Sequence, residues 1–331
     1  MKICIVGAGA IGGYFAARLA HHGQEVSILA RGKTLEAVRT HGIRLSSEGK
    51  QFAERVKASD RAADLGVQDA VIFTVKAPSM PAAAQTIAPL IGPQTMVIPA
   101  ANGLPWWYFL EAPGPLKGHQ LRSLDPQGTT AVAIPAAQVV GCVVFPACSS
   151  PEPGVSIHAS GNRVVFGEPA GNANEGAPSE RVQRITEVFT KAGFGAEASQ
   201  DIRREIWLKL LGNLCFNPVS ALVGCSTDRL IDDPRLHQLF VGMMSEALEL
   251  GRALGIAVDI KPADRIAFTR KLGAVKTSML QDVEAGRPIE IDGILGAPVE
   301  AAEALKHAAP LMSAVYALAR KRAEVLGLLP G

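Results

Sequence analysis

A glycine motif that follows a short apolar run constrains the fold of this chain more than any other feature. Residues 2–7, KICIVG, are typical of a buried strand, and residues 11–23, IGGYFAARLAHHG, of a helix that Gly23 ends. Between them, GAGAIG at residues 7–12 fits the pattern GxGxxG. A strand, a glycine turn and a helix in this order predict the first βαβ unit of a parallel, doubly wound sheet.

The glycines of this loop suit a bound dinucleotide. Gly7 allows a tight turn, Gly9 lets the backbone approach a pyrophosphate, and Gly12 lets helix and strand pack closely. The helix N-terminus adds unpaired N–H groups and the positive end of a dipole. The alternative is a purely structural glycine turn. We expect dinucleotide binding by the whole loop, which consists of Gly7, Ala8, Gly9, Ala10, Ile11 and Gly12.

The end of the second predicted strand, residues 25–31, indicates which dinucleotide binds. Sites for NAD usually carry an acid there, which binds the ribose 2′-hydroxyl. This chain has Arg31 and then Lys33, and no acid. A guanidinium suits a 2′-phosphate, so the sequence favours NADP(H) over NAD(H). The alternative for Arg31 is an ordinary solvated charge.

Two further predicted strands, residues 69–77 and 95–103, end near polar side chains. Lys76 lies at the end of the first and Asn102 at the end of the second. Ligands of open α/β sheets bind outside the carboxyl ends of the strands, so both residues are candidates for ligand contacts. Lys76 could equally be a solvated lysine, and Asn102 a turn residue before glycine.

The pattern changes near residue 200, where strand signals end and long helical periodicity begins. We expect an α/β protein in which residues 1–199 form a Rossmann-type doubly wound sheet and residues 200–331 an all-helical C-terminal domain. Residues 112–137 are rich in Gly, Pro and polar residues and predict an irregular insertion. Other predicted elements are strands at 141–148, 154–160 and 162–168, a loop at 170–178, and helices at 179–194 and 234–254.

The first helix of the second domain carries a polar stripe. Residues 207–217, WLKLLGNLCFN, are mostly apolar, yet Lys209, Asn213 and Asn217 recur every four residues. This spacing places the three on one helix face. Such a stripe lines a site, faces water with a snorkelling lysine, or forms a polar seam toward a neighbouring helix.

Composition excludes several classes of partner. The net charge is +2, with both signs mixed along the chain, so we expect no nucleic-acid partner. Prolines break the uncharged stretches 77–110 and 126–151, and the first residues enter the glycine motif directly, so we expect neither a membrane partner nor a targeting segment. Five cysteines without a CxxC pair, and no HExxH, indicate reduced thiols in a cytoplasmic protein without a metal site.

These residues together resemble the ketopantoate reductase (2-dehydropantoate 2-reductase) family. The resemblance covers nearly the whole chain, through GAGAIGG, TVKA, NG, EPGVSIH and GE. Its most specific parts are IWLKLLGNLCFNPVSAL and, at residues 277–294, TSMLQDVEAGRPIEIDGI. The resemblance implies a Rossmann domain plus a helical domain with the active site in the cleft between them. It also implies NADPH-dependent reduction of a 2-keto acid to a 2-hydroxy acid in pantothenate synthesis.

The resemblance assigns roles residue by residue. Lys209 matches the catalytic lysine, a proton donor beside the keto oxygen, and Glu290 a catalytic acid that also contacts the cofactor. Asn102 matches a residue near both cofactor and substrate. Further matches are substrate contacts at Asn213, Asn217 and Ser278, and NADPH contacts at Arg31 and Lys76. Without the resemblance, Glu290 and Asp292 are equally typical of acids in the first turn of a helix.

Several positions depart from the family pattern and leave the identity of the 2-keto acid open. Ala101 replaces a glutamine, and the aromatic run Trp106–Tyr108 either reshapes the pocket or packs beneath it. Thr227 and Val275 stand where some members carry Asn. The alternatives are a reductase of another 2-keto acid and a non-catalytic NADP-binding sensor, which has no reason to keep Lys209 and Glu290 together. The sequence leaves open whether the protein forms a homodimer.

Overall fold

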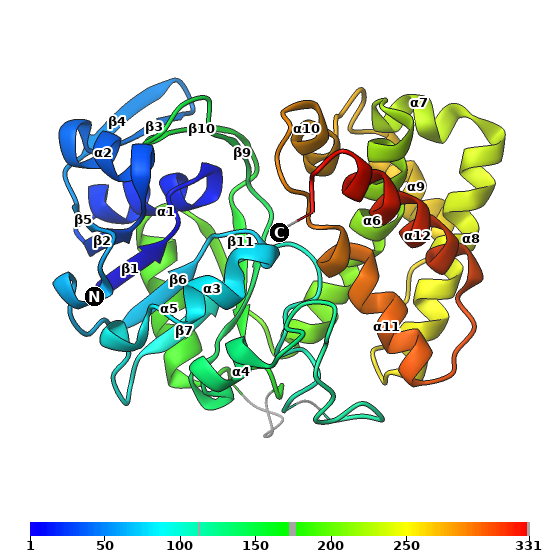
Figure 1. Ribbon diagram of the computed structural model, residues 1–331, viewed down its shortest axis with the longest axis horizontal. Coiled ribbons are helices and arrows are strands. Elements are labelled where there is room, and N and C mark those ends of the chain that lie inside the picture. The colour runs from blue at the N-terminus through cyan, green and yellow to red at the C-terminus, as the bar shows by residue number, and fades with distance from the viewer. Residues whose placement is uncertain (112, 172–176, 330–331) are drawn as a thin grey trace. The chain divides into compact units, whose positions relative to one another are not determined.

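The structure is a computed structural model that describes residues 1–111, 113–171 and 177–329 (Figure 1). The chain forms two compact units, Met1–Ala101 with Gly128–Ile202 and Asn102–Gln127 with Arg203–Gly331. This division differs from the predicted continuous ranges 1–199 and 200–331. Residues 102–127 cluster with the helical unit, because this segment packs on helices that follow it much later in the chain.

The first unit is built on a five-stranded parallel sheet with strand order β5-β2-β1-β6-β7. Its strands are β1 (Lys2–Val6), β2 (Glu25–Leu29), β5 (Lys57–Ser59), β6 (Ala70–Phe73) and β7 (Met96–Pro99). The predicted strands at 2–7, 25–31, 69–77 and 95–103 are thereby confirmed. Their apolar runs are buried, as expected of a parallel sheet whose two faces are covered.

Helices and short 3₁₀ turns connect these strands. They are α1 (Ala10–His21), α2 (Gly32–His41), η1 (Ala62–Asp64), η2 (Ala77–Ser79), α3 (Met80–Ala84) and η3 (Ala88–Leu90). After the segment that joins the other unit, α4 (Thr129–Ala133) and η4 (Ala136–Gln138) follow. The predicted insertion at 112–137 is therefore helical in its last part, while residue 112 lies outside the described residues.

The remaining strands of this unit form two separate small sheets instead of extending the parallel one. One has the order β4-β3-β10-β9 and the other β12-β11-β8, and each contains at least one antiparallel pair. Their strands are β3 (Ile43–Ser47), β4 (Lys50–Glu54), β8 (Gly141–Val144), β9 (Ala147–Ser149), β10 (Val155–Ser160), β11 (Arg163–Gly167) and β12 (Gly195–Ala198). The sequence did not predict β3, β4, β5 or β12. Residues 172–176 of the predicted loop at 170–178 lie outside the described part of the chain.

The helix predicted at 179–194 is confirmed as α5 (Glu180–Lys191). Aromatic side chains fill the core of this unit where α1 meets α5. The ring of Phe15 lies edge-on to that of Phe189, with centroids 5.2 Å apart. Phe166 of β11 meets the same ring at 4.9 Å. Because α1 contacts both β1 and β10, the dinucleotide helix is fixed between two sheets.

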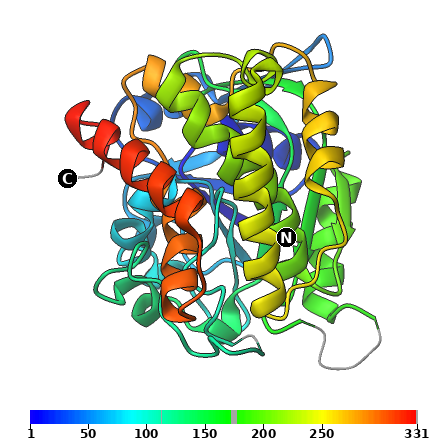
Figure 2. The ribbon, with the colours of Figure 1, turned by 90° about the vertical axis from the view of Figure 1, so that its right-hand side faces the viewer.

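The second unit is helical. Its elements are α6 (Ile202–Val223), α7 (Thr227–Asp232), α8 (Pro234–Ala253), α9 (Pro262–Arg270), α10 (Ser278–Glu284), the π-helix η5 (Asp292–Gly296), α11 (Ala297–Ala304) and α12 (Pro310–Val325). The helix predicted at 234–254 is confirmed as α8. Figure 2 shows α12 as a long red helix with the orange segment of η5 and α11 beside it.

Helix α6 is the one described helix long and apolar enough to cross a membrane by length and composition. Its most apolar window has a mean hydropathy of 1.4, and 72% of that window is buried inside the protein. Burial of this extent is what the core helix of a helical bundle shows.

Candidate active site

The glycine loop of the first unit has room for a ligand at one glycine and none at the next. Gly7 has φ +91°, and its carbonyl lies so close to Gly12 that a Cβ on Gly12 would be 2.0 Å from it. A Cβ on Gly9, in contrast, would meet no protein atom within 4 Å. No side chain caps the N-terminus of α1, which begins directly after Gly9. These features fit a dinucleotide whose phosphates approach the loop at Gly9.

Two side chains that hold the glycine loop were not predicted from sequence. Thr74, directly after β6, donates its hydroxyl to the carbonyl of Gly7. Ser156 of β10 is fully buried and donates to the carbonyl of Ala10 at 2.6 Å, in the first turn of α1. The stretches FTVKAP and EPGVSIH contain these residues. No local sequence pattern predicts these bonds, because each hydroxyl binds a carbonyl that is distant in sequence.

The two predicted cofactor cations follow strands of the parallel sheet. Arg31 is exposed two residues after β2 and is the N-cap of α2, whose first turn contains no acid. Lys76 is half-buried after β6 and is the N-cap of η2. The place where an NAD-binding acid would stand therefore holds a cation in the structure as well.

In the second unit, three of the predicted residues meet. The Nζ of Lys209 donates to Oδ1 of Asn102 at 2.8 Å, and Nδ2 of Asn102 donates to Oε2 of Glu290 at 3.4 Å. All three side chains are half-buried. The amide thus presents its acceptor to the ammonium and its donor to the carboxylate, which fixes its orientation. We call Lys209, Asn102 and Glu290 the polar relay.

The aromatic run Trp106–Tyr108, which follows Asn102, is buried in the second unit. Tyr108 is fully buried and donates its hydroxyl to the carbonyl of Arg203 at 2.9 Å. Its ring lies 6.4 Å from that of Trp207, and the Arg203 guanidinium lies over it at 5.1 Å. These contacts anchor the first turns of α6, from which Lys209 extends.

The other predicted substrate residues lie on α6 and α10. Asn213, one turn beyond Lys209, is half-buried, and Asn217 is 6% exposed. Over the described ranges, neither amide makes a hydrogen bond within the protein. Ser278 is the exposed first residue of α10, and the hydroxyl of the preceding Thr277 caps that helix by accepting from Leu280 N. The structure does not bond these three residues to the polar relay.

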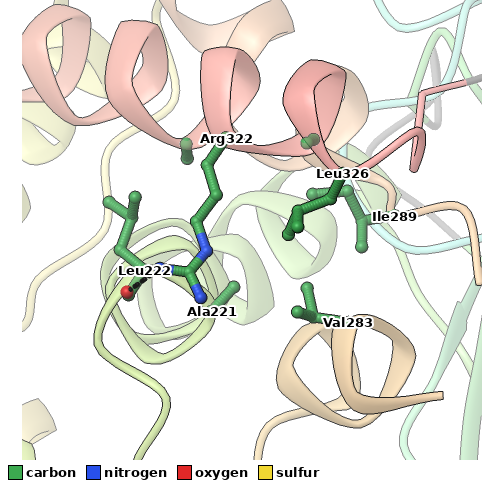
Figure 3. A pocket seen from close by; sticks show the side chains of 8 residues that line it. Ala221, Leu222, Val283, Ile289, Arg322 and Leu326 are labelled. Carbon is green, nitrogen blue, oxygen red and sulfur yellow. Dashed lines mark hydrogen bonds between the residues drawn. The ribbon is translucent and has the colours of Figure 1, made fainter. Parts of the chain in front are cut away.

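The segment that carries Glu290 is held by apolar packing. Figure 3 shows Ile289, Leu326 and Val283 around a small hollow, across which Nη1 of Arg322 donates to the carbonyl of Leu222 at 2.6 Å. The hollow measures about 10 Å³, the space of a single water at most, so it is not a ligand site. Ile289 N also donates to Leu328 O at 3.1 Å. Glu290 therefore directly follows Ile289, whose backbone and side chain are both held in place.

Two positions that depart from the family pattern contact each other. Thr227 donates its backbone N–H to the carbonyl of Val275 at 2.9 Å, and its hydroxyl donates to the same carbonyl at 3.3 Å. The pair joins the start of α7 to the chain between α9 and α10. These contacts account for Thr227 structurally.

Comparison with known proteins decides the family. The description "Ketopantoate reductase PanE/ApbA" matches residues 3–171, and "Ketopantoate reductase PanE/ApbA C terminal" matches residues 201–323. The chain belongs to the ketopantoate reductase family. The protein is therefore an oxidoreductase of this family, and its Rossmann domain belongs to a pyridine-nucleotide-dependent dehydrogenase.

Individual relatives of this ketopantoate reductase family member match over nearly their full length. A 2-dehydropantoate 2-reductase from Mesorhizobium japonicum is 44% identical over 99% of both chains. A crystal structure from Ralstonia solanacearum, provisionally assigned as a ketopantoate reductase, is 45% identical over 99% of both chains, with a TM-score of 0.94. The 2-dehydropantoate 2-reductase from Methylococcus capsulatus is 27% identical over 98% of both chains, with a TM-score of 0.82.

Proposed function

We propose that the protein reduces 2-dehydropantoate (ketopantoate) to pantoate with NADPH, a step of pantothenate biosynthesis. The observation that carries this proposal is the polar relay, in which Asn102 joins Lys209 to Glu290 by hydrogen bonds. A protein that only senses NADP has no use for a half-buried ammonium that is linked through an amide to a carboxylate. The name of the 44% identical relative supports ketopantoate as the substrate.

Lys209 is proposed as the proton donor. NADPH, when bound, supplies a hydride to the keto carbon and becomes NADP⁺. The keto oxygen gains negative charge as this happens, and the Lys209 ammonium stabilises that charge and delivers a proton to form the hydroxyl. Asn102 holds the ammonium in place, and Glu290 accepts from Asn102 and so fixes its amide.

The substrate is proposed to lie along the stripe of α6. Asn213 and Asn217 have amides without a protein partner in the described residues, so both are available to the carboxylate and hydroxyl of a 2-keto acid. Ser278, exposed at the start of α10, adds a hydroxyl donor. Glu290 is proposed to contact both substrate and cofactor.

The choice of NADPH over NADH rests on Arg31. Its guanidinium is exposed after β2 and suits a 2′-phosphate. Lys76, after β6, is proposed as a second phosphate contact, and the backbone of residues 7–12 as the pyrophosphate site. All five cysteines are free thiols, which supports a reducing, cytoplasmic location.

A reductase of another 2-keto acid is the remaining alternative of the same chemistry. The departure that favoured it, the run Trp106–Tyr108, is buried in the second unit and anchors α6. That structural role of the aromatic run supports ketopantoate as the proposed substrate.

The experiment is NADPH oxidation by the purified protein, followed by absorbance, with ketopantoate beside a panel of other 2-keto acids. We expect ketopantoate to give the highest kcat/KM, with NADPH preferred to NADH. If only a different 2-keto acid were reduced, that compound would replace ketopantoate as the proposed substrate. Tight NADPH binding without turnover of any 2-keto acid would favour the sensor.

A further inference from the structure

The π-helix η5 leaves one backbone carbonyl without a helical partner. Ala297 N donates to the carbonyl of Asp292, five residues earlier, instead of to Gly293. The next residue that could serve Gly293 in this register is Pro298, which has no N–H. The Gly293 carbonyl instead accepts from Leu104 N at 2.8 Å. The π turn thus captures a segment almost two hundred residues away in sequence.

This capture fixes the residue at the centre of the polar relay. Gly103 has φ +86°, and a Cβ there would lie 2.3 Å from the backbone carbon and oxygen of Gly293. Residues 102–104 therefore lie directly on the π turn. Asn102, at the start of this contact, reaches Lys209 with one amide atom and Glu290 with the other.

Tyr316 of α12 holds the π turn at both ends. Its hydroxyl donates to Oδ1 of Asp292, the first residue of η5, at 2.7 Å. Its ring lies on Gly296, the last residue, where a Cβ would be 2.8 Å from the tyrosine oxygen. Nε of Arg320, one helical turn farther along α12, donates to the same Asp292 oxygen at 3.1 Å. Burial and the Asp292 carboxylate raise the pKa of Tyr316 above its usual value, so the hydroxyl keeps the proton that it donates.

We propose that Asp292 and Tyr316 are positioning residues for the reduction, which act by holding η5 in the π register that orients Asn102. In a regular α-helical register, Ala297 N–H would bond to the Gly293 carbonyl, and Leu104 would lose its acceptor. The Asp292–Tyr316 bond opposes that shift. The inference rests on the proposed function, because it assigns a catalytic purpose to the orientation of Asn102.

The test compares Tyr316→Phe with a control on the same helix. Glu246 accepts from Leu311 N and Met312 N and so caps α12 without touching Asp292. We expect Tyr316→Phe to lower kcat for ketopantoate about fivefold or more, with KM for NADPH within about twofold of wild type. Glu246→Gln should lower the melting temperature at least as much and leave kcat within about twofold.

A double-mutant cycle and a second readout complete the test. Asp292→Ala should lower kcat at least as much as Tyr316→Phe, because it also removes the acceptor of Arg320. The double variant should lose little more than Asp292→Ala, because both changes break the same Tyr316–Asp292 bond. Asp292→Asn, which keeps an acceptor for Tyr316, should retain most of the activity. Additive losses, or equal kcat losses in Tyr316→Phe and Glu246→Gln, would overturn the proposal.

Hydrogen exchange separates this inference from the proposed function. The peptide that contains Leu104 should exchange faster in Tyr316→Phe than in Glu246→Gln, whether or not the protein turns over ketopantoate. Unchanged exchange at Leu104 in Tyr316→Phe would refute the positioning role by itself. Faster exchange in a protein that reduces no 2-keto acid would leave the structural link intact and refute the proposed function.

Discussion

The side chain of Asn102 lies between Lys209 and Glu290, with its oxygen 2.8 Å from the lysine nitrogen and its nitrogen 3.4 Å from a glutamate oxygen. A neutral amide can accept from an ammonium through its oxygen and donate to a carboxylate through its nitrogen at the same time. The Asn102 amide thereby holds the Lys209 ammonium and the Glu290 carboxylate of the polar relay at fixed places.

Replacing Asn102 should therefore damage catalysis more than folding. Asn102→Ala removes the acceptor that holds Lys209, and we expect kcat to fall about 10²-fold, as for loss of a positioned proton donor. Asn102→Asp should also be poor, because it sets a carboxylate beside that of Glu290. Steady-state kinetics and thermal melting of both variants check this. An Asn102→Ala variant with wild-type kcat would show that the relay does not hold the proton donor.

Gly9 and Gly12 should respond differently to the same substitution. A Cβ on Gly9 meets no protein atom, so Gly9→Ala should fold normally and raise the Kd for NADPH about tenfold or more by blocking the pyrophosphate. A Cβ on Gly12 would collide with the Gly7 carbonyl, so Gly12→Ala should lower the free energy of unfolding by about 3 kcal/mol. Melting curves and NADPH titrations separate the effects. Equal loss of stability in both variants would contradict this account of the loop.

Arg31 should set the preference between the two dinucleotides. Losing a charge-assisted bond to the 2′-phosphate costs about 1.5–3 kcal/mol, so Arg31→Ala should raise KM for NADPH roughly tenfold to a hundredfold. KM for NADH should hardly change. Arg39, also exposed on α2 but bonded to the Ala58 carbonyl, offers Arg39→Ala as a matched control. Equal effects of Arg31→Ala on both dinucleotides would refute the assignment.

Glu168 should make stability depend on acid pH. Burial opposes its ionisation, but hydrogen bonds from Arg181 and Ser179 outweigh that effect and lower its pKa below the usual 4.5. A lowered pKa in the folded state stabilises the fold above the unfolded-state value, and this stability is lost as pH falls through the folded-state pKa.

Denaturant unfolding at several pH values tests this dependence. Glu168→Gln should lower the free energy of unfolding at pH 7 by about 2 kcal/mol and flatten its decline in acid. Glu197 pairs with Arg163 at the surface, so Glu197→Gln should cost less than about 0.5 kcal/mol. A Glu168→Gln variant as acid-sensitive as wild type would disprove the argument.

Local pattern predicted the parallel sheet and the helical second half, because short apolar runs and helical periodicity are local signals. It did not predict β3 and β4, where the polar stretch IRLSSEGKQFAE forms a hairpin. It also predicted continuous domains, whereas residues 102–127 cluster with the helical unit, where Gly103 lies against Gly293. No local signal reports such a distant contact.

The residues of the candidate site likewise include some that local pattern predicts and others that it does not. The spacing of Lys209, Asn213 and Asn217 on one helix face is readable from periodicity alone. That Asn102 and Glu290 join Lys209 is not, because Asn102 is 107 residues from Lys209 and 188 from Glu290. Family resemblance indicated those members of the site. Tyr316 was missed because an aromatic residue on an amphipathic helix is more typical of the core.

The most direct measurement is kcat/KM for ketopantoate in Lys209→Met, with the Kd for NADPH measured on the same protein. If Lys209 is the proton donor, kcat/KM should fall about 10²–10⁴-fold while the Kd for NADPH and the melting temperature stay near wild type. A Lys209→Met variant that reduces ketopantoate at close to the wild-type rate would contradict the account, and the proton would have to come from another group.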